Sequence, residues 1–130
     1  MQIEKLIEVA EELKFKLKVS NVRVEIDSSD NSPGWKFNEW EMKGVPIRLE
    51  IGPRDIEKGV AQLVRRDTFD KTEVSLKNIE AEVNKLLDEI HNNMLFKAKK
   101  FRDEHIVEVH NMEELKAAVD SGNFAKAMWD

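Results

Sequence analysis

Basic and aromatic side chains gather in one stretch of the chain, between Trp35 and Arg66. Its aromatic residues are Trp35, Phe37 and Trp40, and its notable basic residues are Lys36, Arg48, Arg54, Arg65 and Arg66. Proteins that bind single-stranded RNA stack its bases on aromatic rings or guanidinium planes and place Lys and Arg against its phosphates. The stretch therefore indicates an RNA-binding surface.

The carboxylates of the same stretch include Glu39 and Glu41. A Glu side chain accepts hydrogen bonds from exocyclic amino groups of bases, so either residue can read a base instead of only repelling phosphate. A second interpretation is purely structural. In it Phe37 and one of the two Trp residues anchor the core, and Arg48 with Glu50 forms the polar face of a strand. Periodicity alone favours this second interpretation.

The composition excludes several kinds of catalytic and metal-binding site. The 130 residues include no Cys, which excludes disulfides, thiol nucleophiles and thiolate zinc sites, and the three His residues are scattered at His91, His105 and His110. We expect those His side chains to be solvated or to cap helices. The chain has no GxSxG, no glycine-rich phosphate loop and no HExxH. We predict no catalytic site and no metal site.

The net charge of −5 hides an asymmetry along the chain. Residues 35–66 carry a net charge of +2, and the remainder carries −7. No stretch approaches the roughly 20 apolar residues of a membrane span, and the first residues lack the apolar core of a signal peptide. We therefore expect a cytoplasmic protein with no membrane partner.

The spacing of apolar residues predicts the elements that must position these side chains. Apolar positions every three or four residues indicate helices, and strict alternation indicates strands. Helices are predicted at 2–17, 75–104 and 111–122, with a short helix or turn at 35–43 and at most one turn at 54–58. Strands are predicted at 22–26, 47–51, 60–65, 72–74 and 105–110 and near the end of the chain, with a loop at 27–34. This order implies α/β layers in which helices cover a mixed sheet.

Four short motifs at fixed spacing carry a family resemblance. They are G-x-K-F at 34–37, W-E-x-K-G-V-P at 40–46, R-x-E-x-G-P-x-D at 48–55 and R-R-D at 65–67. Together they resemble the anticodon-binding domain of prolyl-tRNA synthetases, in the archaeal and eukaryotic-like form of that class II family. The resemblance continues more weakly along the long helix and into residues 105–129, which are similar to the start of the C-terminal domain of that form.

The resemblance implies a fold and a division of the chain. The fold is the class II anticodon-binding α/β fold, a mixed sheet flanked by helices, with a partial C-terminal α+β extension. The implied parts are an anticodon-binding domain at 1–75, a long linking helix at 76–104 and the start of a C-terminal domain at 105–130. Family members open with an apolar strand and continue into a cysteine-bearing segment. We therefore expect an excised piece whose sheet has an unpaired edge.

The resemblance also implies a function, partners and site residues. The domain reads the anticodon loop of proline tRNA for a parent enzyme, a homodimer whose catalytic domain attaches proline to tRNA with ATP and Mg²⁺; no cofactor is expected in the present residues. The implied RNA-binding residues are Lys36, Glu39, Glu41, Arg48, Arg54, Arg65 and Arg66. The alternative from another class is a free-standing protein-interaction domain without RNA specificity, whose Lys and Arg residues only confer solubility.

Because the sequence contains no nucleotide-binding motif, we predict that this chain alone does not activate proline. The measurement is proline-dependent exchange of pyrophosphate into ATP by the purified chain. Exchange above the level of a protein-free sample would contradict the prediction.

Overall fold

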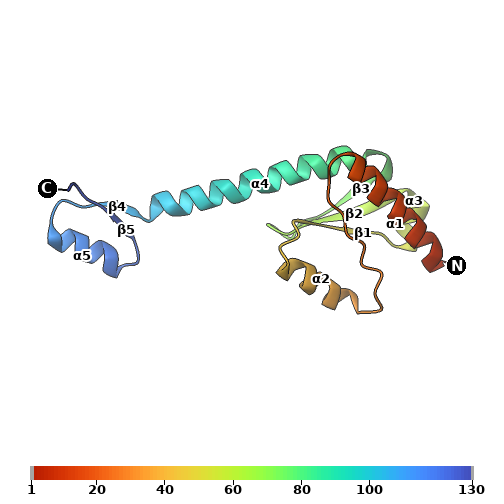
Figure 1. Ribbon diagram of the computed structural model, residues 1–130, viewed down its shortest axis with the longest axis horizontal. Helices are drawn as coiled ribbons and strands as arrows, with labels where there is room; N and C mark the ends of the chain where they lie inside the picture. Colours follow the sequence, from red (N-terminus) through yellow and green to blue (C-terminus); the bar gives the residue numbers. More distant parts are fainter. Residues whose placement is uncertain (1, 130) are drawn as a thin grey trace. The chain divides into compact units, whose positions relative to one another are not determined.

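The computed structural model describes residues 2–129, whose helices and strands are labelled in Figure 1. These residues form two compact units with a boundary between His91 and Asn92. The first unit contains three strands and the helices packed on them. The second contains the end of the long helix, a pair of short strands and one further helix. The predicted α/β class is confirmed, whereas the predicted three-part division at residues 75 and 104 stays a prediction.

The first helix, α1 (Gln2–Val19), buries one face against the sheet. Leu13 and Leu17, four residues apart, are among its buried side chains, as the predicted stripe requires. Asn21 ends the helix in the left-handed conformation at φ 64°, and the N–H of Val22 donates to the carbonyl of Leu17 at 2.9 Å. This terminal turn satisfies a carbonyl that the helix leaves free.

The predicted strand at 22–26 is wrong. Val22 and Val24 are half-buried and pack against the core, as their alternation indicated, but the segment belongs to no ladder among the described strands. Alternation reports which side chains face the core, whereas a strand also needs a neighbouring backbone. The three strands of this unit pair with one another instead.

The sheet of the first unit has β2 (Val60–Arg65) at its centre, between β1 (Ile47–Glu50) and β3 (Lys71–Ser75). Both pairings are antiparallel, so the predicted hairpin of β2 and β3 is confirmed. Leu49 of β1 is opposite Leu63 of β2, and Arg48 is opposite Val64. Since side chains alternate across a strand, these two pairs lie on opposite faces of the sheet.

Helices cover both faces of this sheet. One face packs against α1 and the start of α4 (Ile79–Glu104), and its buried cluster is Leu13, Leu17, Ala61, Leu63, Val74, Ile79 and Val83. A short α3 (Pro53–Lys58) packs against α1 and β2. The other face meets α2 (Pro33–Met42), which Figure 1 shows across the sheet from α1. The predicted long helix is confirmed as α4, preceded by a 3₁₀ turn, η1 (Leu76–Asn78), whose N-cap is Ser75.

The second unit pairs β4 (Ile106–Glu108) with β5 (Phe124–Lys126) in parallel and joins them through α5 (Met112–Asp120). Asn111 caps α5, as predicted, by accepting from the N–H of Glu114 at 2.8 Å. At the end of α4, His105 Nδ1 lies 2.6 Å from the carbonyl of Phe101, which is the capping role expected of it. No helix within residues 2–129 is long and apolar enough to cross a membrane.

The core of the first unit predicts a large cost for removing a central side chain. Leu63 is 1% exposed, so Leu63→Ala should lower the free energy of unfolding by about 2–5 kcal/mol. Urea denaturation followed by circular dichroism measures this loss. Ile3→Ala is the control, because Ile3 is 71% exposed and its replacement should change stability by less than about 0.5 kcal/mol. Equal losses in the two variants would contradict this description of the core.

Candidate nucleic-acid interface

The face of the sheet toward α2 carries Val64 and five polar side chains in two rows. Register places Arg48, Val64 and Lys71 in one row across the three strands, and Glu50, Gln62 and Glu73 in the next. Side chains in neighbouring rows of one face are close enough to pair. On the face beside α2, the cations Arg48 and Lys71 in one row therefore lie next to the carboxylates Glu50 and Glu73 in the other.

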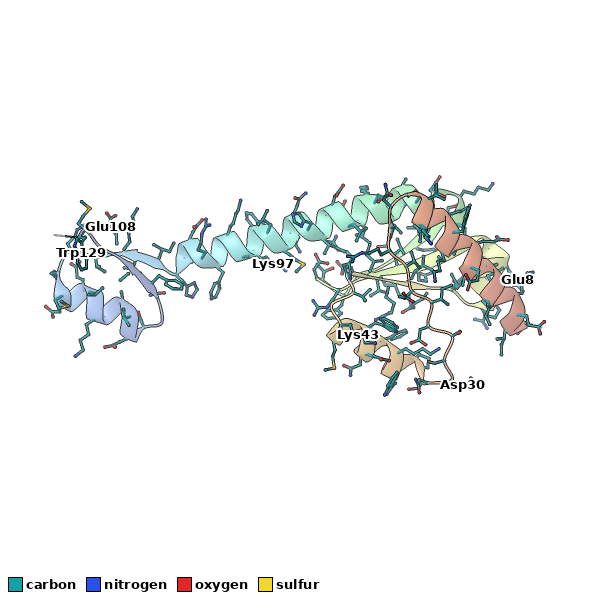
Figure 2. The ribbon with its side chains drawn as sticks, viewed as in Figure 1. Glu8, Asp30, Lys43, Lys97, Glu108 and Trp129 are labelled. Atoms are coloured by element: carbon teal, nitrogen blue, oxygen red, sulfur yellow. The ribbon has the colours of Figure 1, made fainter. Side chains whose placement is uncertain are left out.

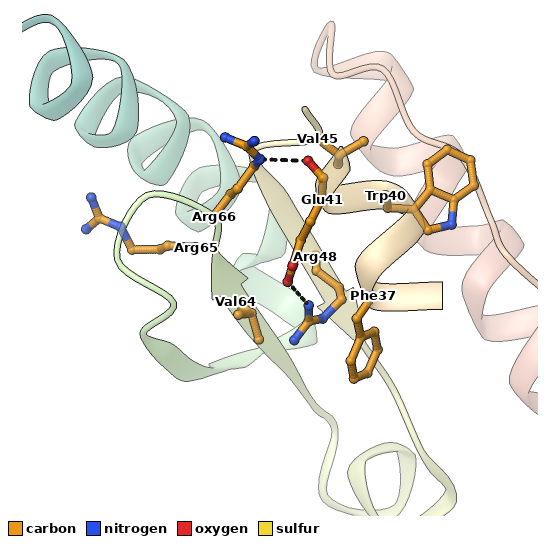
Figure 3. A pocket seen from close by; sticks show the side chains of 8 residues that line it. All are labelled: Phe37, Trp40, Glu41, Val45, Arg48, Val64, Arg65 and Arg66. Carbon is orange, nitrogen blue, oxygen red and sulfur yellow. Dashed lines mark hydrogen bonds and ion pairs between the residues drawn. The ribbon is translucent and has the colours of Figure 1, made fainter. Parts of the chain in front are cut away.

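A shallow hollow lies where α2 meets this face (Figure 3). Its lining residues are Phe37, Trp40, Glu41, Val45, Arg48, Val64, Arg65 and Arg66. A volume of about 20 Å³ is room for roughly one water molecule. The hollow therefore cannot hold a small-molecule substrate, and the candidate site is the polar surface around it.

Arg48 is the most constrained cation of this surface. Its Nε donates to Glu50 at 2.8 Å and its Nη1 donates to Glu41 at 3.1 Å. Its guanidinium carbon lies 3.6 Å from the centroid of the Phe37 ring, a cation–π contact that holds the charged plane against the aromatic face. The side chain remains 25% exposed. Arg48 is thus fixed in one orientation and still reaches solvent.

Glu50 is shared between Arg48 and Lys71, whose Nζ lies 2.7 Å from the second carboxylate oxygen. Burial alone would raise the pKa of Glu50, but the hydrogen bonds from Lys71 and Arg48 outweigh it, so the pKa is lowered below its ordinary value. The carboxylate therefore stays ionised and keeps its ion pair with Arg48.

Arg66 extends the same surface from the end of β2. Its Nε donates to the backbone carbonyl of Glu41 at 2.9 Å, and its own N–H donates to the carbonyl of Pro46 at 2.9 Å. Figure 3 shows both contacts of Glu41, the carboxylate with Arg48 and the carbonyl with Arg66. Glu41 thus joins α2 to β1 and to the end of β2.

Lys36 and Trp40 fasten α2 to the loop that precedes it. Trp40 Nε1 donates to the Asp27 carboxylate at 2.8 Å, and Lys36 Nζ lies 3.4 Å from the Asp27 carbonyl and 3.9 Å from its carboxylate. Hydrogen bonds from the side chains of Ser29 and Trp40 and from the Ser29 backbone, with the charge of Lys36, lower the pKa of Asp27 to about 2. Lys36 therefore has a local partner in addition to any role toward RNA.

Arg65 is adjacent to Arg66 in the sequence, but its guanidinium lies on the opposite face of the sheet, toward α4. It makes a two-point contact with Asp67, at 2.9 and 2.8 Å, and reaches Glu89 of α4 at 3.4 Å. The hydrogen bond with Asp67 is the main cause of a raised pKa at Arg65. Figure 3 shows its guanidinium directed away from Arg48. The structure therefore separates these two residues of the predicted set.

The remaining predicted residues lie outside the hollow or at its border. Glu39 pairs with Lys43 one helical turn later at 3.0 Å, and Lys43 lies 4.4 Å from the Trp40 ring centroid. Arg54 is exposed on α3, which packs on α1 and β2. The structure thus brings together Glu41, Arg48 and Arg66, with Lys36 nearby on α2.

Sequence reasoning missed two partners that position these side chains. Lys71 was recoverable in principle, because the register of the hairpin places it beside Val64 on the face of Arg48. No sequence pattern indicated a role for Asp27, because it lies in a loop of turn-forming residues and its contact with α2 depends on the tertiary structure. Within residues 2–129 we find no group of three His, Cys, Asp or Glu side chains arranged to hold a metal ion.

Residues 1–86 match the protein family described as anticodon binding domain. Proline–tRNA ligases of Alkaliphilus oremlandii (strain OhILAs) and Clostridium botulinum (strain Langeland / NCTC 10281 / Type F) are each 54% identical to this chain, over 97% of it and 26% of their own length. A crystal structure of prolyl-tRNA synthetase from Cryptosporidium parvum, complexed with L-proline and AMP, matches with a TM-score of 0.91 at 37% identity, over 99% of this chain and 27% of that one. The chain spans about a quarter of the length of these relatives.

The contacts of Asp27 predict a pH dependence of stability. Since folding lowers its pKa from 3.8 to about 2, the ionised carboxylate stabilises the fold above about pH 4, and this contribution is lost as the pH falls toward 2. Asp27→Asn should therefore flatten the dependence of the urea midpoint on pH in that range, as measured by tryptophan fluorescence. The matched control is Asp30→Asn, which changes an exposed residue of the same loop. A wild-type pH dependence in Asp27→Asn would contradict the prediction.

Proposed function

Since this chain belongs to the family of anticodon-binding domains, we propose that it recognises the anticodon loop of proline tRNA through the surface formed by α2, β1 and the end of β2. The bases of an anticodon loop are unpaired, so their edges and faces are open to a protein. A surface of stacked and hydrogen-bonding side chains suits that target better than a deep pocket.

The arrangement of Arg48 is the observation that carries this proposal. Two carboxylates and the ring of Phe37 hold its guanidinium in one plane. A guanidinium has further N–H donors beyond those two, and Arg donating to O6 and N7 is the commonest specific contact with guanine. Because the plane is already fixed by protein contacts, little side-chain entropy is lost when a base binds. Arg48 is thus suited to discriminate between bases.

Glu41 adds a second means of discrimination. A carboxylate accepts hydrogen bonds but donates none when ionised, so it favours base edges that carry amino or imino N–H groups. Its neighbour Arg66 is exposed and stands at the border of the same surface. We assign Glu41 and Arg48 to base reading and Arg66 to the sugar–phosphate backbone at its edge.

The resemblance to proline–tRNA ligases supports a wider proposal about the parent protein. In it this domain serves a cytoplasmic enzyme that attaches proline to tRNA, and its partners are the proline tRNA, the catalytic domain and a second subunit. ATP and Mg²⁺ belong to that catalytic domain. The residues described here contribute the choice of tRNA and not the chemical step.

We predict that Arg48→Ala weakens binding of the proline tRNA anticodon stem-loop by about 1–3 kcal/mol and narrows its advantage over a stem-loop with altered anticodon bases. Lys36→Ala should also weaken binding of the proline stem-loop, since Lys36 lies nearby on α2. Fluorescence anisotropy with both labelled stem-loops measures affinity and discrimination together. Lys5→Ala and Lys116→Ala, which lie outside the motifs, are the controls and should change neither quantity.

Two outcomes would contradict this assignment. If Arg48→Ala weakens both stem-loops equally and reduces the salt dependence, Arg48 contacts phosphate and does not read bases. If the wild-type chain binds neither stem-loop, even at low salt, while it associates with polypeptide through an apolar surface that salt does not weaken, the protein-interaction alternative is correct.

A further inference from the structure

Most cations of the proposed base-reading surface are held in ion pairs. Arg48 is paired with Glu41 and Glu50, Lys71 with Glu50 and Lys43 with Glu39, whereas Arg66 donates to a backbone carbonyl and keeps its charge for phosphate. Phosphate contacts that release counterions supply most of the sequence-independent affinity of nucleic-acid-binding proteins. A domain whose base-reading surface holds most of its cations in ion pairs therefore needs further cations elsewhere to bind RNA tightly.

The second half of α4 carries such further cations. Residues 79–91 of this helix carry a net charge of −3, whereas residues 92–102 contain four cations and no carboxylate. These cations are Lys97, Lys99, Lys100 and Arg102, and two phenylalanines stand among them in the run FKAKKFR, which we name the basic–aromatic segment (residues 96–102). The reversal of charge within one continuous helix distinguishes this segment from an ordinary solvated helix surface.

The side chains of the basic–aromatic segment are exposed. Phe96 is 66% exposed and Phe101 is 62% exposed. Lys97, which Figure 2 labels on α4, and Lys99 are exposed as well, and within residues 2–129 neither makes an ion pair. The Phe101 ring stacks on His105 with centroids 3.9 Å apart. Rings and free ammonium groups are therefore presented together.

Two carboxylates follow the segment and limit its charge. Lys100 lies 3.9 Å from Glu104, and Arg102 lies 3.0 Å from Asp103. A shallow hollow on the second unit is lined by Phe96, Lys99, Lys100, Asp103 and Glu104. Both pairs are exposed, and pairs of that kind are weak and yield to a stronger anion.

Stabilisation of the helix by its own dipole explains only part of this charge. Cations near the C-terminus of a helix are favourable within its last turn. Of the four, only Arg102 lies in the last turn of α4. Two Lys residues of α1, Lys16 and Lys18, contrast with this segment because they do lie in the last turn of their helix.

We propose that the basic–aromatic segment of α4 is a second RNA-contacting surface, which binds a single-stranded RNA segment without sequence preference. Lys97, Lys99 and Lys100 contact phosphates, and bases stack on Phe96 and Phe101, the combination that such binding uses. This inference rests on the proposed function and adds that two surfaces have different roles. The surface formed by α2, β1 and the end of β2 discriminates between bases, and the basic–aromatic segment supplies affinity.

The test compares two triple variants of the full chain that remove the same charge. K97A/K99A/K100A changes the basic–aromatic segment, and K5A/K16A/K18A removes three exposed Lys residues from α1. Ala is a strong helix former, so both helices should persist, and circular dichroism checks this. The probes are the proline tRNA anticodon stem-loop, the altered stem-loop and an unstructured oligouridylate, each titrated between roughly 50 and 200 mM salt.

We expect K97A/K99A/K100A to weaken binding of all three probes about tenfold or more at the low-salt end and to reduce the slope of log affinity against log salt by about 2. Its preference for the proline stem-loop over the altered one should stay as in the wild type. Phe96→Ala should weaken oligouridylate binding about tenfold with an unchanged salt slope, since stacking releases no counterions. K5A/K16A/K18A should behave as the wild type.

The outcomes separate this inference from the proposed function. Equal losses in the two triple variants, or no loss in K97A/K99A/K100A, overturn the second surface whether or not discrimination is seen. A chain that binds all three probes equally, through these Lys residues, overturns anticodon reading and supports the second surface. If Phe96→Ala leaves RNA binding unchanged but abolishes self-association of the chain, the segment binds protein and the inference is wrong.

Discussion

The register of β2 between β1 and β3 decides which side chains of this domain act together. Ala61 and Leu63 of β2 face α1 and α4 and are almost completely buried, so the strand cannot slip by one residue without exposing them. The same register turns Val64 toward α2 and places it opposite Arg48. Burial of apolar side chains on one face thus fixes the positions of the polar side chains on the other.

The polar face uses ion pairs for orientation. Arg48, Glu41 and Glu50 are each partly exposed, where pairs contribute little to stability. Together with the Phe37 ring, however, they restrict the guanidinium to one plane. This arrangement fixes the geometry of the guanidinium and engages its positive charge in ion pairs. Residues 92–102, on another part of the chain, carry an excess of cations.

Periodic patterns predicted much of the fold because each reports a local repeat. The stripe of α1, the hairpin of β2 and β3, the length of α4 and the Asn111 cap of α5 all depend on residues close in sequence. Residues 22–26 show the limit of such patterns. Their alternation correctly predicted that Val22 and Val24 are half-buried, but it carried no information about a partner strand. Pairing between strands is set by distant parts of a chain.

The sequence by itself determined the α/β class and the family, and it predicted a set of candidate RNA-binding residues, because motif spacing and side-chain chemistry are local properties. Only the tertiary structure divided that set. Arg65 and Arg66 are adjacent in the sequence, yet strand alternation and the carboxylate of Asp67 hold the charge of Arg65 beside α4, whereas Arg66 reaches the carbonyl of Glu41. Likewise Asp27 contacts Trp40 across the loop between them. Such contacts depend on packing between elements, which no local pattern encodes.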